Sequence, residues 1–289
     1  MNPTDIAQKR PRLVISPDSG MMHHYISHVF SDHEIIPLAD AGDVDMPSLM
    51  VYCPSAESVE ASSAEAVADY IVSHSPESVV MISSVSVYGK EEGEMVDESS
   101  PTWPGPGAAS VMLEAERLLQ KACGAKGINL LILRPAMMFG TGVEGEAARM
   151  FAAVVSGRYL HVRGNDARIS IITALDVARA ARALAHTDGI YNVADGRPCT
   201  RRQLAEAMSA NAGRHHRMST LPLKWAGALS PLALIVPALR PMFGRDALRR
   251  SMQTLTFSTD KLAGAAGLKM YDTLEVIART AADYPYEEE

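Results

Sequence analysis

Cysteine is scarce in this chain of 289 residues, because Cys53, Cys123 and Cys199 are widely spaced and form no CxxC pair. An odd and scattered set argues against a disulfide framework and is typical of a reducing compartment. Such cysteines are best interpreted as small packed apolar side chains. The polar stretch from Met1 to Arg12 contains no apolar core of a secretory signal, so the sequence predicts a cytoplasmic protein.

Excess positive charge and long apolar runs are also missing. The net charge is −7 with a pI near 5.7, and no basic stripe occurs, which argues against nucleic acid and anionic membranes as partners. Prolines interrupt the apolar stretch 221–243, and its best part, 225–239, is shorter than the roughly 20 residues of a membrane span. We interpret it as two short helices of a substrate-side lid, with peripheral membrane contact as the alternative.

Metal-ligand clusters are absent too. The histidine pairs at 23–24 and 215–216 have no carboxylate or cysteine partners at ligand spacing, so we expect no metal site.

What the chain does contain is 47% hydrophobic residues, enough to bury one large α/β domain or a domain with a smaller lobe. Apolar runs predict parallel strands, at 12–16, 34–39, 49–53, 79–83 and 128–134.

The run from Val79 to Ile82 organises the sequence, since a serine cluster and then Tyr88-Gly89 follow it. This pattern predicts a buried parallel strand that carries hydroxyl groups to its carboxyl end, where open α/β sheets bind ligands. We therefore select Ser83, Ser84 and Ser86 as candidate site residues.

The serine strand is followed by Asp97-Glu98, Pro101, Pro104 and Glu116, and then by the segment from Leu133-Arg134-Pro135 to Phe139-Gly140. With these motifs the chain resembles the extended short-chain dehydrogenase/reductase superfamily, in its NAD-dependent epimerase/dehydratase branch. The resemblance implies a Rossmann-like, doubly wound parallel sheet with a small carboxyl-terminal substrate lobe. It places the dinucleotide-binding core at 1–145, while 146–289 complete the core and form the lobe.

The family's glycine motif is degenerate here. The pattern Thr-Gly-x-x-Gly-x-x-Gly falls on Ser16, Pro17, Gly20 and His23, so only one glycine remains. Proline lacks an N–H group and His23 adds bulk, so we expect weak pyrophosphate binding or none. Asp40 stands where the family binds a ribose hydroxyl, which favours NAD over NADP, although a solvated turn residue is the alternative. The resemblance also implies cofactor contacts at Ser83 and Pro135.

Two features set this chain apart from the family. Only residues 41–47 separate the second and third apolar runs, which is too short for the usual helix crossover, so one helix–strand unit is expected to be missing. A gapless alignment places the catalytic Tyr and Lys positions on Ala108 and Met112, which we expect to face the site near Ser84. Tyr88 is a candidate replacement acid, although the family uses this tyrosine mainly structurally.

The resemblance assigns Ser84 to the catalytic serine position and implies substrate contacts at Ser86 and Arg168, the latter to a phosphate of a nucleotide sugar. Two functional classes stay open. One is an active nicotinamide-dependent reductase, epimerase or dehydratase with a non-standard proton donor. The other is a degenerate relative that binds a dinucleotide, a metabolite or a protein, and the missing Tyr and Lys favour it. Whether the chain forms a homodimer also stays open.

Overall fold

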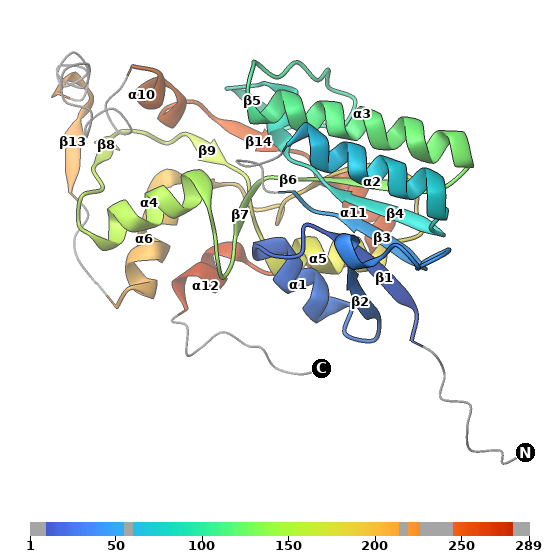
Figure 1. Cartoon of the computed structure of the whole chain (residues 1–289). Helices are drawn as coiled ribbons and strands as arrows, with labels where there is room; N and C mark the ends of the chain where they lie inside the picture. The colour runs from blue at the N-terminus through green and yellow to red at the C-terminus, as the bar shows by residue number, and fades with distance from the viewer. Residues whose placement is uncertain (1–9, 55–59, 214–218, 226–244, 280–289) are drawn as a thin grey trace, which may run out of the picture.

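The computed structural model describes residues 10–54, 60–213, 219–225 and 245–279. Its centre is a six-stranded parallel sheet in the order β2-β1-β3-β4-β6-β11 (Figure 1). The strands are β1 (Arg12–Ser16), β2 (Glu34–Pro37), β3 (Leu49–Tyr52), β4 (Ser78–Ile82), β6 (Asn129–Pro135) and β11 (Gly189–Val193). The predicted doubly wound parallel sheet is confirmed, and the five predicted strands are present.

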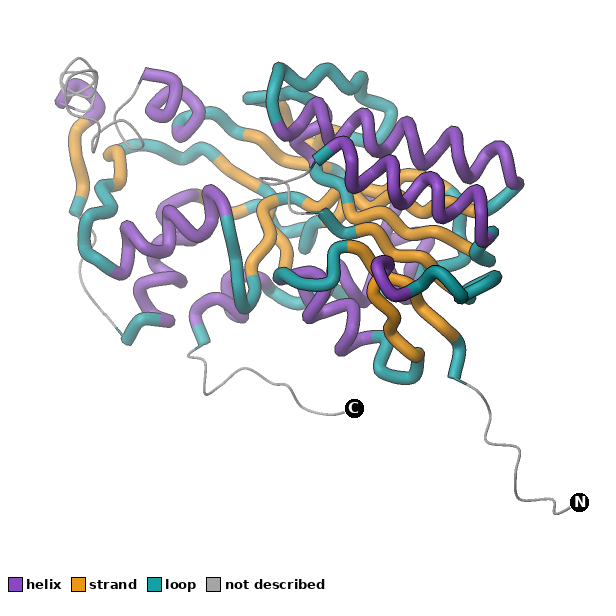
Figure 2. The backbone as a smooth tube through the Cα atoms, viewed as in Figure 1, coloured by secondary structure: helices purple, strands orange, loops and turns teal. Residues whose placement is uncertain are grey.

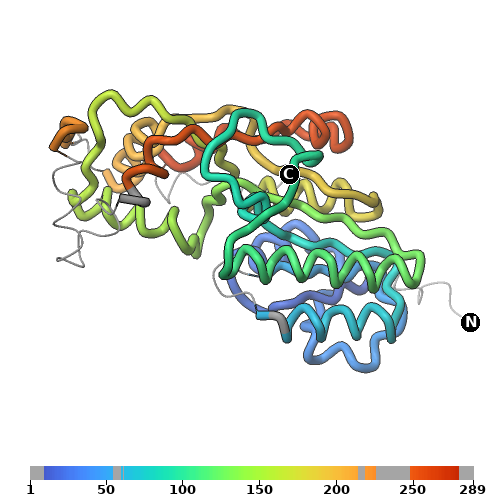
Figure 3. Tube along the Cα trace, turned by 90° about the horizontal axis from the view of Figure 1, so that it is seen from above, coloured from blue at the N-terminus to red at the C-terminus, as the bar shows by residue number. Residues whose placement is uncertain are grey.

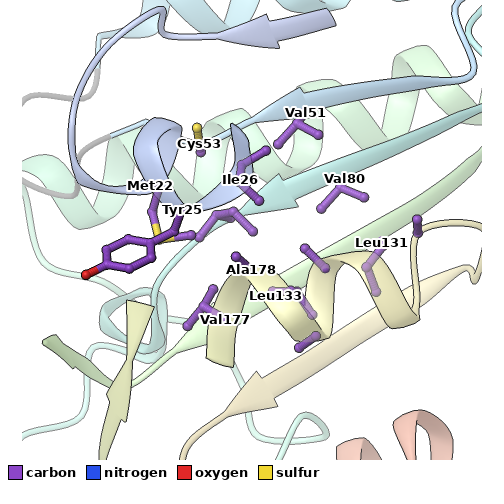
Figure 4. Packing of buried hydrophobic residues seen from close by; sticks show 14 of the residues in the cluster. Met22, Tyr25, Ile26, Val51, Cys53, Val80, Leu131, Leu133, Val177 and Ala178 are labelled. Atoms are coloured by element: carbon purple, nitrogen blue, oxygen red, sulfur yellow. The ribbon is translucent and has the colours of Figure 1, made fainter. Parts of the chain in front are cut away.

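Helices cover both faces of this sheet (Figures 1 and 2). One layer contains α1 (Met21–Val29), α5 (Ala174–Ala183) and α11 (Asp260–Ala266). The opposite layer contains α2 (Ala61–His74) and α3 (Ala108–Lys126), which pack on each other. Each layer buries its own apolar cluster, as expected for strands buried on both faces. Figure 4 shows Ile26 of α1 over the sheet, on the side where Val80 and Leu133 lie, and Met22 next to Tyr25; all belong to one buried apolar cluster.

The connection between β2 and β3 contains only the single turn η1 (Leu38–Asp40) and no further strand. Since β2 and β3 lie on opposite sides of β1, the chain crosses directly to the other half of the sheet. Ala41 and Val44 of the connection are buried against α2. The expected loss of one helix–strand unit is therefore confirmed, and β2 forms an edge of the sheet.

The smaller lobe lies at the carboxyl edge of the sheet, to the left of the core in Figures 1 and 3. Its main sheet has the order β12-β9-β14-β5, and the pairs β7–β10 and β8–β13 accompany it. The strands are β5 (Gly93–Val96), β7 (Met137–Phe139), β8 (His161–Arg163), β9 (Arg168–Ile169), β10 (Ile171–Thr173), β12 (Cys199–Thr200), β13 (Thr220–Pro222) and β14 (Leu255–Phe257). The helices are α4 (Gly145–Val155), α6 (Arg201–Asn211), α10 (Arg245–Ser251) and α12 (Thr273–Ala278).

Helix starts follow the sequence signals closely. Thr173 caps α5 by accepting a hydrogen bond from Asp176 N, and Thr200 forms a capping box with Gln203 at the start of α6. Most of the stretch 221–243, interpreted as lid helices, lies outside the described residues, and its first two residues belong to β13 and not to a helix. Among the helices that are described, none has the length and apolarity to cross a bilayer.

Candidate functional site

A cavity of about 780 Å³ opens at the carboxyl edge of the large sheet. Its floor is built from four strand ends: Ser16 of β1, Cys53 after β3, Ser83 after β4 and Pro135 of β6. After β1 the chain forms β2 on one side of β1 and then β3 on the other side. The strand order therefore reverses at β1, and parallel sheets bind ligands at the carboxyl edge of such a switch point. Segments of the lobe, including α4, β9 and β14, close the opposite side.

The three serines selected from the sequence all line this cavity. Ser83 Oγ donates a hydrogen bond to Glu116 Oε1 at 2.5 Å, so its proton is committed and its oxygen can only accept from a ligand. Ser84 Oγ instead accepts from Ser86 N at 3.1 Å, which leaves its proton available for donation. The cavity floor therefore offers one acceptor and one donor side by side.

A buried ion pair between Glu116 and Arg134 holds the Ser83 hydroxyl in place. Glu116 of α3 is 1% exposed, and Arg134 of β6 grips it with Nε at 3.0 Å and Nη2 at 2.6 Å. The Arg134 guanidinium also lies 4.9 Å from the ring centroid of Tyr88. Bidentate pairing satisfies both charges inside the protein. Sequence reasoning used Glu116 and Arg134 only as family markers and missed their support of Ser83.

Tyr88 does not reach the cavity. Its ring is 2% exposed, its hydroxyl donates to Asn192 Oδ1 at 2.7 Å, and Phe257 stacks on it. Burial raises the pKa of the phenol, although Arg134 acts in the opposite direction. A raised pKa and an internal partner suit a structural tyrosine better than a proton donor for a ligand.

Ala108 and Met112 do not line the cavity either, contrary to the expectation that they face it near Ser84. Gly107 precedes the first turn of α3, so Ala108 begins the helix. Met112 is 1% exposed because it packs into the apolar cluster shared by α2, α3 and the sheet. In the described part of the chain, α3 thus brings no tyrosine or lysine to the cavity.

The turn between β1 and α1 forms one wall of the cavity through Ser16, Pro17, Ser19 and Gly20. Gly20 has φ 99°, a conformation that favours glycine, and the space beside it is open. His23 of α1 does not line the cavity. Its side chain therefore does not narrow the space in which a pyrophosphate is expected. Pro17 still removes one N–H from the turn.

A second hollow of about 660 Å³ adjoins the cavity and shares Ser16, Pro17 and Ser63 with it. It lies beyond the end of β2, where an adenosine moiety would be expected. Asp40 does not line it: this residue ends the η1 turn and is exposed. The carboxylates that do line the hollow belong to Asp18 and Asp69.

Arginines reach the lobe side of the cavity, but from other positions than expected. Arg168 is exposed on β9 and absent from the lining, whereas its neighbour Ile169 lines the cavity. Successive strand residues face opposite sides, so only one of the two can point inward. The lining contains Arg201, Arg250 and Lys90 instead. Arg201 is 15% exposed and pairs with Glu146 at 2.9 Å.

For two of the residues that sequence reasoning missed, a neighbouring motif indicates a position near the site. Lys90 directly follows Gly89 at the end of the serine cluster, and Arg201 directly follows the helix cap Thr200. Neither signal says which side a side chain faces, because that depends on how the lobe packs against the core. Of the expected site residues, the cavity collects Ser16, Gly20, Ser83, Ser84, Ser86 and Pro135, but neither Asp40, Tyr88 nor Arg168.

Residues 55–194 match the model of the NAD dependent epimerase/dehydratase family. The matched segment contains the serine cluster, α3 and Arg134, the features on which the resemblance rested. For this segment, the resemblance inferred from the sequence is confirmed.

One curated relative is the uncharacterized protein y4nG of Sinorhizobium fredii, 24% identical over 201 residues. The alignment covers 68% of this chain but only 48% of the relative, so the chain spans about half the length of that protein.

Solved structures share the fold at low identity. RMD from Pseudomonas aeruginosa, complexed with NADPH, is 18% identical with a TM-score of 0.67, and the match covers 93% of this chain and 97% of that chain. UDP-N-acetylglucosamine 4-epimerase from Methanobrevibacter ruminantium, in complex with UDP-N-acetylmuramic acid, is 15% identical with a TM-score of 0.70 and coverages of 96% and 98%. The Bacillus cereus UDP-N-acetylglucosamine 4-epimerase is 14% identical with a TM-score of 0.68, covering 92% and 98%.

Proposed function

We propose that this chain is a member of the epimerase/dehydratase family that binds NAD weakly, binds an anionic metabolite such as a nucleotide sugar beside it, and lacks Tyr–Lys hydride-transfer catalysis. The observation that carries this proposal is the composition of the cavity. It lies at the switch point and is lined by Ser83 and Ser84, yet α3 supplies no proton-relay side chain to it. Since fold alone does not determine activity, the composition of the site is what favours binding over turnover.

The cofactor half of the cavity fits a dinucleotide in part. The amino end of α1 and Gly20 border the cavity, so free N–H groups and the positive end of the helix dipole can face a pyrophosphate. Pro17 weakens this contact, and no arginine or lysine stands in the described turn. Ser84 and Pro135 would border the nicotinamide, which when bound supplies a hydride acceptor. A structural neighbour of the same fold is complexed with NADPH, which supports a dinucleotide as the ligand class.

The cavity lining carries both charges: it contains Arg201, Arg250 and Lys90 together with Glu60, Glu91, Glu144 and Glu146, and Glu146 pairs with Arg201. We expect an anion to bind at the guanidinium groups on the lobe side. Guanidinium groups bind phosphate and carboxylate with two parallel hydrogen bonds. The epimerase neighbour that holds a UDP sugar acid supports a nucleotide sugar as the ligand class. For the cellular setting we propose the cytoplasm, because Cys53, Cys123 and Cys199 are all free thiols.

Thermal unfolding with NAD, NADP and a panel of nucleotide sugars tests this function. A ligand present at about 100 times its Kd stabilises the folded state by roughly 2.7 kcal/mol, so even weak binding produces a measurable rise in Tm. We expect NAD to stabilise the protein and Ser84→Ala to reduce that effect, whereas Ser156→Ala, outside the cavity, leaves it unchanged. No stabilisation by any compound at millimolar concentration would contradict the proposal.

An active enzyme is the second candidate, and the position of Lys90 favours it. This lysine lines the cavity and makes no ion pair within the described residues, so its ammonium group could donate a proton to a bound ligand. Assays of NAD reduction and sugar epimerisation decide between the candidates. Turnover that Lys90→Met lowers by about 10²-fold or more would establish the enzyme. Absence of turnover together with retained ligand binding would favour the non-catalytic relative.

A further inference from the structure

The charge of this chain is unevenly distributed along the sequence. The net charge of the whole chain is −7, yet the stretch 201–250 contains nine arginines and lysines and only two carboxylates, Glu206 and Asp246. This stretch begins with α6 and ends within α10, so it belongs to the lobe. The argument from net charge against an anionic surface as a partner therefore applies to the chain as a whole but not to this part of it.

Exposed apolar side chains occur at the outer end of the same lobe. Leu223 and Trp225, which come directly after β13, have exposed fractions of 48% and 59%. Lys224 between them is exposed as well. In Figures 1 and 3, β13 lies at the end of the lobe that is farthest from the large sheet. These three residues do not line the cavity, so a ligand bound there does not explain their exposure.

The neighbouring strand adds a second cation. Because β13 pairs with β8 in parallel, the exposed Arg163 lies beside the last residue of β13 and next to the start of the apolar residues. Within the described residues, neither Arg163 nor Lys224 forms an ion pair. The carboxylates of Asp166 and Glu206 are near β8, but Glu206 is paired with Arg202 at 2.8 Å. Cationic groups thus accompany the exposed apolar side chains.

We propose that Arg163, Leu223, Lys224 and Trp225, here named the outer surface, dock the lobe onto an anionic lipid bilayer. Indole rings are favoured at the level of the lipid headgroups, because they combine an apolar body with an N–H group. Each lysine or arginine close to an anionic bilayer strengthens binding about fivefold. An apolar, a cationic and an apolar residue in three successive positions suit a charged and fluid surface, which requires no matching shape.

The sequence after Trp225 indicates the mode of this contact. The apolar part of that sequence, 225–239, is shorter than the roughly 20 residues of a membrane span. We therefore expect adsorption to one face of a bilayer and not insertion across it. Attachment of this kind takes an apolar and a basic signal together, and the outer surface supplies both.

Tryptophan fluorescence of the full-length protein with lipid vesicles tests this docking. The chain has two tryptophans, and Trp103, on the segment between β5 and α3, is 85% exposed. The variant Trp103→Phe therefore leaves Trp225 as the single tryptophan, and Trp225→Phe leaves Trp103. We expect the emission of Trp103→Phe to shift to shorter wavelength with vesicles of phosphatidylcholine and phosphatidylserine, but not with phosphatidylcholine alone. Trp225→Phe should show no shift with either.

Sedimentation with the same vesicles measures the strength of binding. Trp225→Ser is expected to weaken binding about tenfold, and Lys224→Gln about fivefold. Raising the salt concentration from about 0.1 M to about 1 M should weaken wild-type binding, because the charges are exposed. The matched controls Trp103→Ser and Lys121→Gln, at exposed positions outside the outer surface, should bind as the wild type does. Circular dichroism and Tm should equal the wild type in all four variants.

Three outcomes would overturn the proposal. The wild type stays in the supernatant with phosphatidylserine vesicles, or the controls lose as much binding as Trp225→Ser, or Trp225→Ser changes the oligomeric state while no vesicle binding occurs. The last result would assign the outer surface to a second copy of this chain. Docking is independent of the proposed function, because no ligand of the cavity enters these measurements.

Discussion

At the scale of single residues, the most consequential contact is the buried pair of Glu116 and Arg134. The carboxylate accepts from Arg134 twice and from Ser83 once, so all of these charged and polar groups are compensated without water. Such a pair adds little net stability compared with apolar residues, but removing one partner leaves the other charge buried alone. The main effect of this pair on the free energy of unfolding is therefore expected when one partner is removed.

Glu116→Gln is therefore expected to lower the free energy of unfolding by about 3–5 kcal/mol, because Arg134 would keep a buried and uncompensated charge. Urea denaturation measures this change. The matched control is Glu114→Gln, whose partner Arg117 is 61% exposed while Glu114 itself is 69% exposed. That exposed pair is expected to contribute at most about 1 kcal/mol. Equal losses in the two variants would show that Glu116 is not charged or not buried as described.

At the scale of helices and strands, the sequence was sufficient to predict features that depend only on neighbouring residues, such as strand bounds and helix caps. The apolar run at 49–53 became β3 with one residue of difference, and Thr200 supplies the side-chain cap at the start of α6. Orientation within an element was harder to predict. Arg168 and Ile169 occupy adjacent positions of β9, and only the packing of the lobe decides which faces the cavity.

The same limit applies to α3. An alignment without gaps correctly indicates that Ala108 and Met112 lie on this helix, but their one-turn spacing does not say which part of the helix borders the cavity. The apolar character of Met112 draws it toward the α2–α3 cluster, where it is buried.

The pairing of β8 with β13 is expected to be sensitive to acid. His161 of β8 is buried and its Nδ1 has no partner among the described residues; burial, together with the nearby Arg202, lowers its pKa below the usual 6.5. The unfolded chain then binds a proton more readily than the folded chain. Stability is therefore full above pH 6.5 and falls as the pH decreases toward the lowered pKa.

Unfolding free energies measured from pH 8 to pH 5.5 test this expectation. The wild type should lose stability below pH 6.5 with a slope of at most about 1.4 kcal/mol per pH unit, and His161→Phe should remove this part of the slope. Lys269→Ala, which leaves every histidine in place, serves as the control and should keep the wild-type profile. An unchanged profile in His161→Phe would contradict the assignment.

At the scale of the whole molecule, the carboxyl-terminal part of the chain belongs to the core. The helix α11 covers β11, where Leu262 is 1% exposed and Lys261 Nζ donates to Ile190 O at 2.7 Å. Residues 255–257 likewise join β9 to β5 as β14. Leu262 of α11 and Leu13 of β1 belong to the same buried apolar cluster, so the carboxyl-terminal part helps to complete the core.

Leu262→Ala is expected to destabilise the whole protein by about 2–5 kcal/mol, since it leaves a cavity in the cluster under β11. Thermal unfolding should show one cooperative transition at a lower Tm, monitored at both the core and the lobe. Lys269→Ala, which changes a side chain outside this cluster, is the control and should change stability by less than about 0.5 kcal/mol. Two separate transitions in Leu262→Ala would show that α11 stabilises only a local region.

The missing unit between β2 and β3 also changes how this sheet meets other molecules of the same kind. A strand that would normally lie inside the sheet, β2, is left with a row of backbone groups on its outer side. Open edges of this kind can pair with another chain and start aggregation. Here the edge is only four residues long, begins with the exposed Glu34 and ends with Pro37, which has no N–H to donate. A short, charged and proline-ended edge disfavours backbone pairing with a strand of another chain.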